Sequence, residues 1–132
     1  MHMELKRNLP TNNNWEGSFY ERLSEYGEWN YKAFWILHLE LINIAKNIND
    51  SEIIERELAT ILITLQQKIL NLIVAHFNKK DIFKISNLKE EELFDFIERF
   101  EMAILGALSG VVIPESSFDL VNPLIYPNSS EI

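Results

Sequence analysis

The longest helical pattern in the sequence is EIIERELATILITLQQKILNLIVAHF, which occupies residues 52–77. Its apolar side chains recur at steps of three and four residues, as on one face of an α-helix. They are Ile54, Leu58, Ile61, Leu62, Leu65, Ile69, Leu72, Ile73, His76 and Phe77. Asp50 or Ser51 is the expected N-cap, and Glu52 and Glu55 complement the positive end of the helix dipole. We expect a helix of about 26 residues, on the order of 39 Å long, to be the main support of the fold.

Two stretches with the same spacing flank this one. They cover residues 30–48 and 88–108, and no glycine or proline interrupts residues 28–105. Asn87, with Glu90 three residues later, has the spacing of a capping box. We therefore expect two more long helices, joined by polar turns.

The helix over residues 88–108 is expected to have an apolar inner face and an acidic outer face. The expected inner residues are Leu93, Phe94, Ile97, Phe100, Ile104, Leu105 and Leu108. The expected outer residues are Glu91, Glu92, Asp95, Glu98 and Glu101. This assignment follows from the rarity of unpaired carboxylates in protein cores.

Shorter elements complete the chain at both ends. Residues 15–26 are expected to form a short helix that is capped near Asn14 or Ser18. Its apolar face consists of Phe19, Leu23 and Tyr26. After Gly110 the helical spacing stops, and residues 111–132 are expected to form an extended tail that packs partly on the helices. The apolar residues of this tail include Phe118, Leu120, Leu124, Ile125 and Tyr126.

These elements predict an all-α fold, an irregular antiparallel helical bundle of about four helices with an extended C-terminal tail. Three of the helices are expected to be long. The length of 132 residues suits a single helical domain over residues 1–132, with residues 1–14 as an N-terminal arm.

Composition restricts the possible partners. The chain has 12 Lys and Arg against 20 Asp and Glu, a net charge of −8, so that direct binding of nucleic acid is disfavoured. It has no cysteine, which excludes disulfides, Cys-ligated metals and thiol nucleophiles. The sequence begins without a signal-peptide pattern and has no unbroken apolar run of about 18–20 residues, so we expect neither secretion nor a membrane partner. His2 belongs to a Met-His-Met start typical of a cloning remnant and is not considered a ligand.

Motifs for catalysis are missing from the sequence. It has no HExxH, no Glu-x-x-His helix pair, no EF-hand loop, no P-loop, no dinucleotide fingerprint and no nucleophile elbow. His38 and His76 lie within apolar stripes, where a hydrogen-bonded core histidine is the ordinary interpretation. We therefore expect no catalytic residue, no cofactor and no metal site, and a function other than that of an enzyme.

Two features are left to explain. The segment over residues 15–31 is rich in aromatic residues, of which Phe19 and Trp29, together with Trp35, are expected in the core. The acids gather within residues 21–28 and 90–101. Beyond Arg99 the only charged side chains are those of Glu101, Glu115, Asp119 and Glu131, which we expect at the surface.

The aromatic segment also resembles a known pattern. Lys6-Arg7-Asn8, then Trp15-Glu16-Gly17-Ser18-Phe19, then Trp29, Tyr31 and Phe34-Trp35-x-Leu37 are similar to an "RN…GSF…W" spacing. This pattern resembles the immunity protein 41 family of polymorphic toxin and contact-dependent growth inhibition systems. The resemblance covers about the first third of the chain and, loosely, the long helices after it. Arg7, Gly17 and Ser18 match the pattern, and no toxin-contacting residue is carried over from the family.

The resemblance implies a cytoplasmic protein that binds the C-terminal toxin domain of a cognate effector and neutralises it by occlusion. Toxins of such systems are frequently nucleases with basic clefts, which an acidic inhibitor would complement. The predicted toxin-binding residues are Glu21, Glu25, Glu28, Glu91, Glu92, Asp95, Glu98, Trp15 and Tyr20. The sequence leaves the oligomeric state open.

Two other functions fit the sequence. A helical adaptor or regulatory protein-binding module predicts an exposed apolar groove between helices, whereas a toxin inhibitor predicts a coherent acidic face with aromatic residues at its centre. A bundle that binds a small molecule predicts a closed apolar cavity lined by Trp35, His38 and Phe100.

Overall fold

The computed structural model describes residues 1–125 of the 132 residues. Within these residues the chain is all-helical and has no β-strand, which confirms the predicted fold class. The helices are α1 (Met3–Lys6), α2 (Phe19–Tyr26), α3 (Tyr31–Ile48), α4 (Arg56–Phe77) and α5 (Glu90–Ser109), followed by a 3-10 turn, η1 (Glu115–Ser117). Tyr126 and Glu131 of the predicted tail lie outside the described residues.

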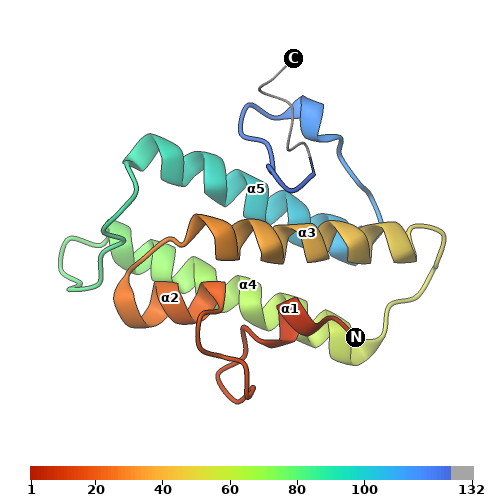
Figure 1. The fold of residues 1–132 in the computed structure, drawn as a ribbon, viewed down its shortest axis with the longest axis horizontal. Helices are drawn as coiled ribbons and strands as arrows, with labels where there is room; N and C mark the ends of the chain where they lie inside the picture. Colours follow the sequence, from red (N-terminus) through yellow and green to blue (C-terminus); the bar gives the residue numbers. More distant parts are fainter. Residues whose placement is uncertain (126–132) are drawn as a thin grey trace.

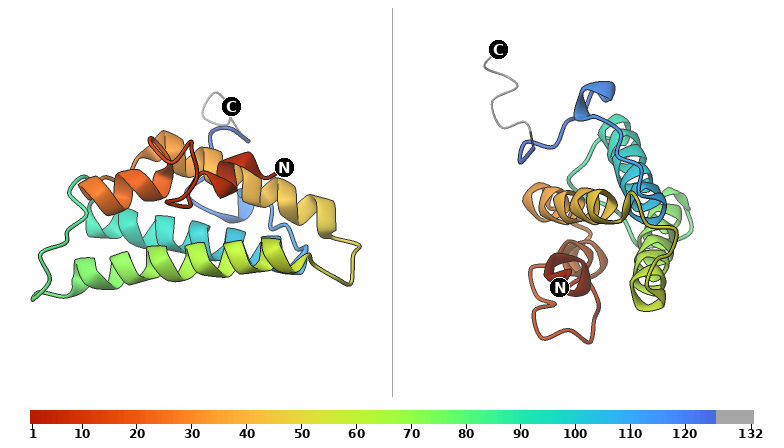
Figure 2. Two further views of the ribbon diagram at one scale, coloured as in Figure 1. Left: turned by 90° about the horizontal axis from the view of Figure 1, so that it is seen from below. Right: turned by 90° about the vertical axis from the view of Figure 1, so that its right-hand side faces the viewer.

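Helix α3 runs through the middle of the molecule (Figures 1 and 2). Helices α1 and α2 lie on one side of it, and α4 and α5 lie side by side on another, with the C-terminal segment folded back near α3 and α5 (Figure 2). Consecutive long helices run in opposite directions, so that α3 and α5 run the same way. The most extensive helix pairing is that of α3 with α5.

An aromatic cluster fills the core where α2, α3 and α5 meet. Phe19 lies 4.8 Å from Trp29, Trp29 lies 5.4 Å from Phe34, and Phe34 lies 5.0 Å from Phe96, measured between ring centroids. Phe19, Trp29 and Trp35 are all buried, as the sequence predicts. Packing of this kind adds to the energy of burial itself because the rings meet edge to face or tilted.

Local hydrogen bonds define where α2 and α3 begin. The Ser18 Oγ accepts from the Glu21 N–H at 3.2 Å, and the Asn30 Oδ1 accepts from the Ala33 N–H at 2.9 Å. Each cap satisfies a backbone donor that the first turn of a helix leaves free. The prediction of a cap at Ser18 is confirmed.

Two other predicted caps are wrong. Helix α4 begins at Arg56, not after Ser51, because the Ser51 hydroxyl bonds to the backbone of Ile53 in a local turn instead. Helix α5 begins at Glu90, and the side chain of Asn87 does not cap it. The Asn87 amide instead accepts from the Trp29 N–H at 2.8 Å and donates to the Trp29 carbonyl at 2.9 Å, so that it joins two distant segments.

The inner face of α5 also differs from the prediction. Phe94 and Leu105, which were expected inside, are each 56% exposed, while Phe96 and Arg99 are buried. The inner residues of α5 are Leu93, Phe96, Arg99, Phe100, Ala103, Ile104, Gly106 and Ala107. Leu93, Phe100 and Ile104 are buried as predicted, so the buried stripe of α5 is shifted about the helix axis toward Phe96 and Arg99. Tyr26, on the predicted apolar face of α2, is exposed.

Two glycines with left-handed backbone lie at the two ends of α2, and their surroundings differ in how tightly they are packed. A Cβ at Gly27 (φ +61°) would overlap the backbone carbonyl of Lys84, whereas a Cβ at Gly17 (φ +82°) would lie 3.3 Å from the flexible Arg7 side chain. We expect Gly17→Ala to lower the free energy of unfolding by about 1–2 kcal/mol, the cost of a left-handed alanine. Gly27→Ala should cost at least about 1 kcal/mol more because backbone must shift. Urea unfolding measures both, and equal losses would contradict the packing described here.

Candidate functional site

Three of the predicted acids form a row on the outside of α5. Glu91, Asp95 and Glu98 are exposed and follow one another at steps of four and three residues, so that they share one stripe of the helix. We call these three residues the α5 acidic row. Glu92 is exposed beside the row and lies near Tyr31, whose pKa is raised first by burial and then by the Glu92 carboxylate.

The N-terminal group of predicted residues is less uniform. Trp15 and Tyr20 are half-buried and pack edge to face with centroids 5.5 Å apart, and burial together with Glu25 raises the pKa of Tyr20. Glu25 is exposed, while Glu28 is partly buried and forms an ion pair with Arg22. The prediction for Glu21 is wrong, since this side chain is buried and accepts from the Gly17 N–H at 3.0 Å. Glu21 stabilises the start of α2 and is not a surface acid.

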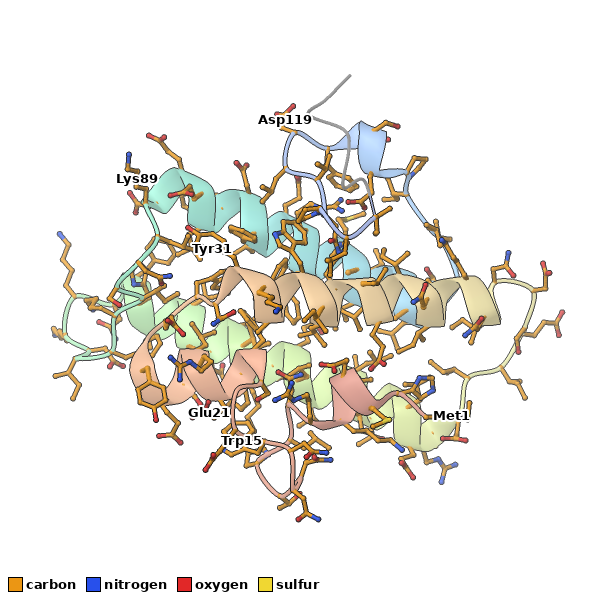
Figure 3. All side chains as sticks on the ribbon, in the orientation of Figure 1. Met1, Trp15, Glu21, Tyr31, Lys89 and Asp119 are labelled. Carbon is orange, nitrogen blue, oxygen red and sulfur yellow. The ribbon has the colours of Figure 1, made fainter. Side chains whose placement is uncertain are left out.

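These two groups do not form one surface. Trp15, Glu21 and the rest of the N-terminal group lie on α2 and the loop before it, and the acidic row lies on α5, with α3 between the two helices (Figures 1 and 3). The coherent acidic face with aromatic residues at its centre, which the toxin-inhibitor hypothesis predicted, is therefore divided. Every member of the α5 acidic row is exposed.

The residues that carry the family resemblance have structural contacts. Arg7 donates to the backbone carbonyls of Asn14 (3.0 Å) and Glu16 (2.6 Å) and so closes the loop before α2. Asn8 is buried, accepts from the Tyr20 N–H at 2.8 Å and donates to a carbonyl of α1 at 2.7 Å. These side chains join α1 to α2.

Exposed apolar side chains, which the sequence did not reveal, also lie on α4 and α5. They are Ile63, Val74, Phe77, Phe94 and Leu105. Phe77 of α4 and Phe94 of α5 stack in parallel with centroids 5.6 Å apart. By length and composition α4 is apolar enough to cross a membrane, with a mean hydropathy of 1.6 over 18 residues of which 33% are buried. A core helix of a water-soluble protein has the same properties, so this finding alone assigns no membrane role.

A buried polar network joins α3, α5 and the C-terminal segment. The Arg99 guanidinium is 2% exposed and forms an ion pair with Glu115. Glu115 also accepts from the Asn122 N–H at 2.7 Å, and the Asn122 side-chain amide donates to the Trp35 carbonyl at 3.0 Å. The expectation that Glu115 lies at the surface is wrong, because its partner, Arg99, faces inward.

His38 lies at the centre of this network. The Arg99 Nη2 is 3.2 Å from its Nε2, and the Asn122 Nδ2 is 2.9 Å from its Nδ1. Both neighbours are donors, so that an imidazolium would find no acceptor. Burial, and then the charge of Arg99, lower the pKa of His38 to about 3. The expected core histidine is confirmed, and the ring stays neutral at physiological pH.

The closed apolar cavity that a small-molecule site predicts does not lie beside His38. The space beside His38 and Arg99 is about 10 Å³, which holds at most one water molecule. Neither Trp35 nor Phe100 lines it. Among the described residues no group of three or more acidic or histidine side chains could hold a metal ion.

No protein-family model, no curated protein and no solved structure matches this chain.

The buried ion pair should be the most sensitive polar contact of the fold. Glu115→Ala is expected to lower the free energy of unfolding by about 3–5 kcal/mol because Arg99 would stay buried without a counter-charge. Replacing both partners with Met and Leu should cost less. Glu28→Ala, which removes a more exposed ion pair, is the matched control and should cost much less. Urea unfolding measures all three, and similar losses for Glu115→Ala and Glu28→Ala would refute this assignment.

His38 should make stability depend on pH. Its pKa is lowered to about 3 in the folded protein. Below pH ~6.5 His38 is protonated in the unfolded chain but stays neutral in the folded protein. The free energy of unfolding therefore falls as the pH drops. The loss should approach about 1.4 kcal/mol per pH unit below pH 6. Denaturant unfolding between pH 7 and pH 5 should show this slope, reduced in His38→Gln. A slope unchanged in the variant would assign the proton uptake to other groups.

Proposed function

We propose that this chain is a non-catalytic immunity protein that binds and neutralises a cognate bacterial toxin domain, in particular a basic nuclease, in the cytoplasm of the producing cell. The observation that carries the proposal is the α5 acidic row. Glu91, Asp95 and Glu98 project into solvent from one rigid helix, with neighbouring Cβ atoms about 5–6 Å apart. The resemblance of the N-terminal pattern to an immunity protein family gives the partner its class.

The charges around the row support a basic partner. From Glu90 to the end of the described residues the only cation is Arg99, which is buried and paired with Glu115. Within this segment every exposed charged side chain is therefore an acid. A negative surface of this kind speeds association with a basic cleft and disfavours acidic partners.

A second function rests on a different observation. The exposed apolar side of α4 and α5, with Phe77 stacked on Phe94, fits an adaptor that binds an apolar helix of a partner. The adaptor function predicts that apolar substitutions on α4 weaken binding more than substitutions in the α5 acidic row do. The immunity function predicts the reverse order.

Co-expression with the toxin encoded immediately upstream tests the proposal. The wild-type chain should restore growth, and the triple variant Glu91→Lys, Asp95→Lys, Glu98→Lys should lose most of this protection. The triple variant should also associate with the toxin at least tenfold more slowly at low salt. Its stability should change by only a few tenths of a kcal/mol per exposed site.

A matched control separates position from net charge. Asp50→Lys, Glu52→Lys, Glu55→Lys makes the same change in net charge at exposed acids between α3 and α4. This control should protect as well as the wild type. Killing that is equal with and without the wild-type chain would refute the proposed function, and equal loss in both triple variants would refute the α5 acidic row as its site.

A further inference from the structure

The stripe that carries the α5 acidic row continues into an apolar hollow. Met102, Leu105 and Ser109 follow Glu98 at steps of four, three and four residues. Together with Gly106, Val111 and Ile113 they line a hollow of about 190 Å³. Leu105 is 56% exposed and Val111 is 61% exposed, so the hollow opens to solvent. One helix face therefore presents carboxylates along its first half and a carbon-lined depression along its second.

The hollow is held in shape by the backbone. Gly110 (φ +80°) turns the chain back after α5, and a Cβ on Gly106 would lie 2.6 Å from the Val111 carbonyl oxygen. The segment that starts at Val111 can thus approach α5 closely only because position 106 is glycine. Further along, Glu115 is fixed by Arg99. Both ends of the wall formed by Val111 and Ile113 are therefore anchored, and the depression exists before any partner arrives.

We propose that this hollow receives one bulky apolar side chain of the partner, and that the same partner segment places its Lys or Arg side chains along Glu91, Asp95 and Glu98. The inference rests on the proposed function and defines the chemistry of the partner at that site. A cavity of about 150 Å³ with aliphatic walls admits benzene, so the hollow has room for one aromatic or branched side chain. Glu98 and Leu105 are seven residues apart, about 10 Å along the helix. The partner's apolar residue therefore lies about 10 Å beyond its last cation.

Charge favours a basic partner over a second copy of this chain. A symmetric dimer through this face would set one α5 acidic row against another, or against the apolar hollow of the second copy, with no exposed cation on α5 to compensate. A membrane is disfavoured in the same way, because anionic headgroups would meet the carboxylates. In a basic segment with an apolar anchor residue, the cations pair with the α5 acidic row and the anchor residue enters the hollow. A buried anchor residue is typical of the centre of an interface.

Substitutions that alter the hollow without changing charge test the proposal with the upstream toxin. Ser109→Phe fills the hollow, Leu105→Ser removes one wall, and Ile82→Ser, at an exposed residue between α4 and α5, is the matched control. The first two should raise the Kd at least tenfold through faster dissociation while the salt dependence of association stays as in the wild type. Ile82→Ser should bind like the wild type. Normal affinity of Ser109→Phe, or an equal loss in Ile82→Ser, would overturn the inference while the immunity function stands.

A synthetic probe tests the hollow even if the wild-type chain does not protect against that toxin. The probe is an alanine-based helical peptide with lysines at i, i+4 and i+7 and phenylalanine at i+14, made in both sequence directions. It should shift the amide resonances of Leu105, Gly110 and Val111 in the full chain. Replacing its phenylalanine with alanine should weaken binding at least tenfold, and replacing its lysines with glutamates should abolish it. Equal binding of the phenylalanine and alanine peptides, or a dimer of this chain that Ser109→Phe dissociates, would overturn the proposal.

Discussion

The buried charge of Arg99 determines the path of the chain after α5. A guanidinium with almost no access to water must find a counter-charge and hydrogen-bond acceptors inside the protein. Glu115 supplies the charge, and Phe118 packs over the guanidinium with its ring centre 3.7 Å from the Arg99 Cζ. Asn122 then joins Glu115 to the Trp35 carbonyl of α3. The segment after α5 is consequently docked on the bundle, although it has no regular secondary structure beyond η1.

The same residue sets the rotation of α5. With Phe96, Arg99 and Phe100 facing inward, the helix repeat of 3.6 residues leaves Glu91, Asp95 and Glu98 on the outside. The outer wall of the apolar hollow lies between Gly110 and Glu115, so it too depends on the ion pair. The acidic half of the proposed binding stripe therefore follows from the rotation of α5, while the hollow also depends on the close approach of Val111 to Gly106.

The sequence predicted the elements whose causes are local. Ser18 caps α2 because its hydroxyl reaches a backbone donor three residues away, and Trp29 and Trp35 are buried because large aromatic side chains usually are. The rotation of α5 was not predictable in this way. Phe94 and Leu105, which are exposed, have the same helical spacing as the buried residues, and the position of α3 decides between them.

Errors at polar residues have the same origin. Glu115 and Glu21 were assigned to the surface because isolated carboxylates belong there. Their partners, Arg99 and the Gly17 N–H, become neighbours only in the folded chain. Asn87 matched a short-range capping pattern but bonds to Trp29, 58 residues away. The sequence shows where the acids lie along the chain, but which of them face solvent depends on such tertiary contacts.

Substitutions in the scaffold and in the proposed binding stripe affect the stability of the fold differently. Arg7 bonds to the loop before α2, Asn8 to backbone groups of α1 and α2, and Ser18 to the first turn of α2, so changes there disturb the fold itself. The side chains of the α5 acidic row make no such contacts and can change at little cost in stability. An inhibitor of the proposed kind must adjust to one toxin while its fold stays constant. A rigid helix whose outer stripe is free of structural contacts meets that requirement.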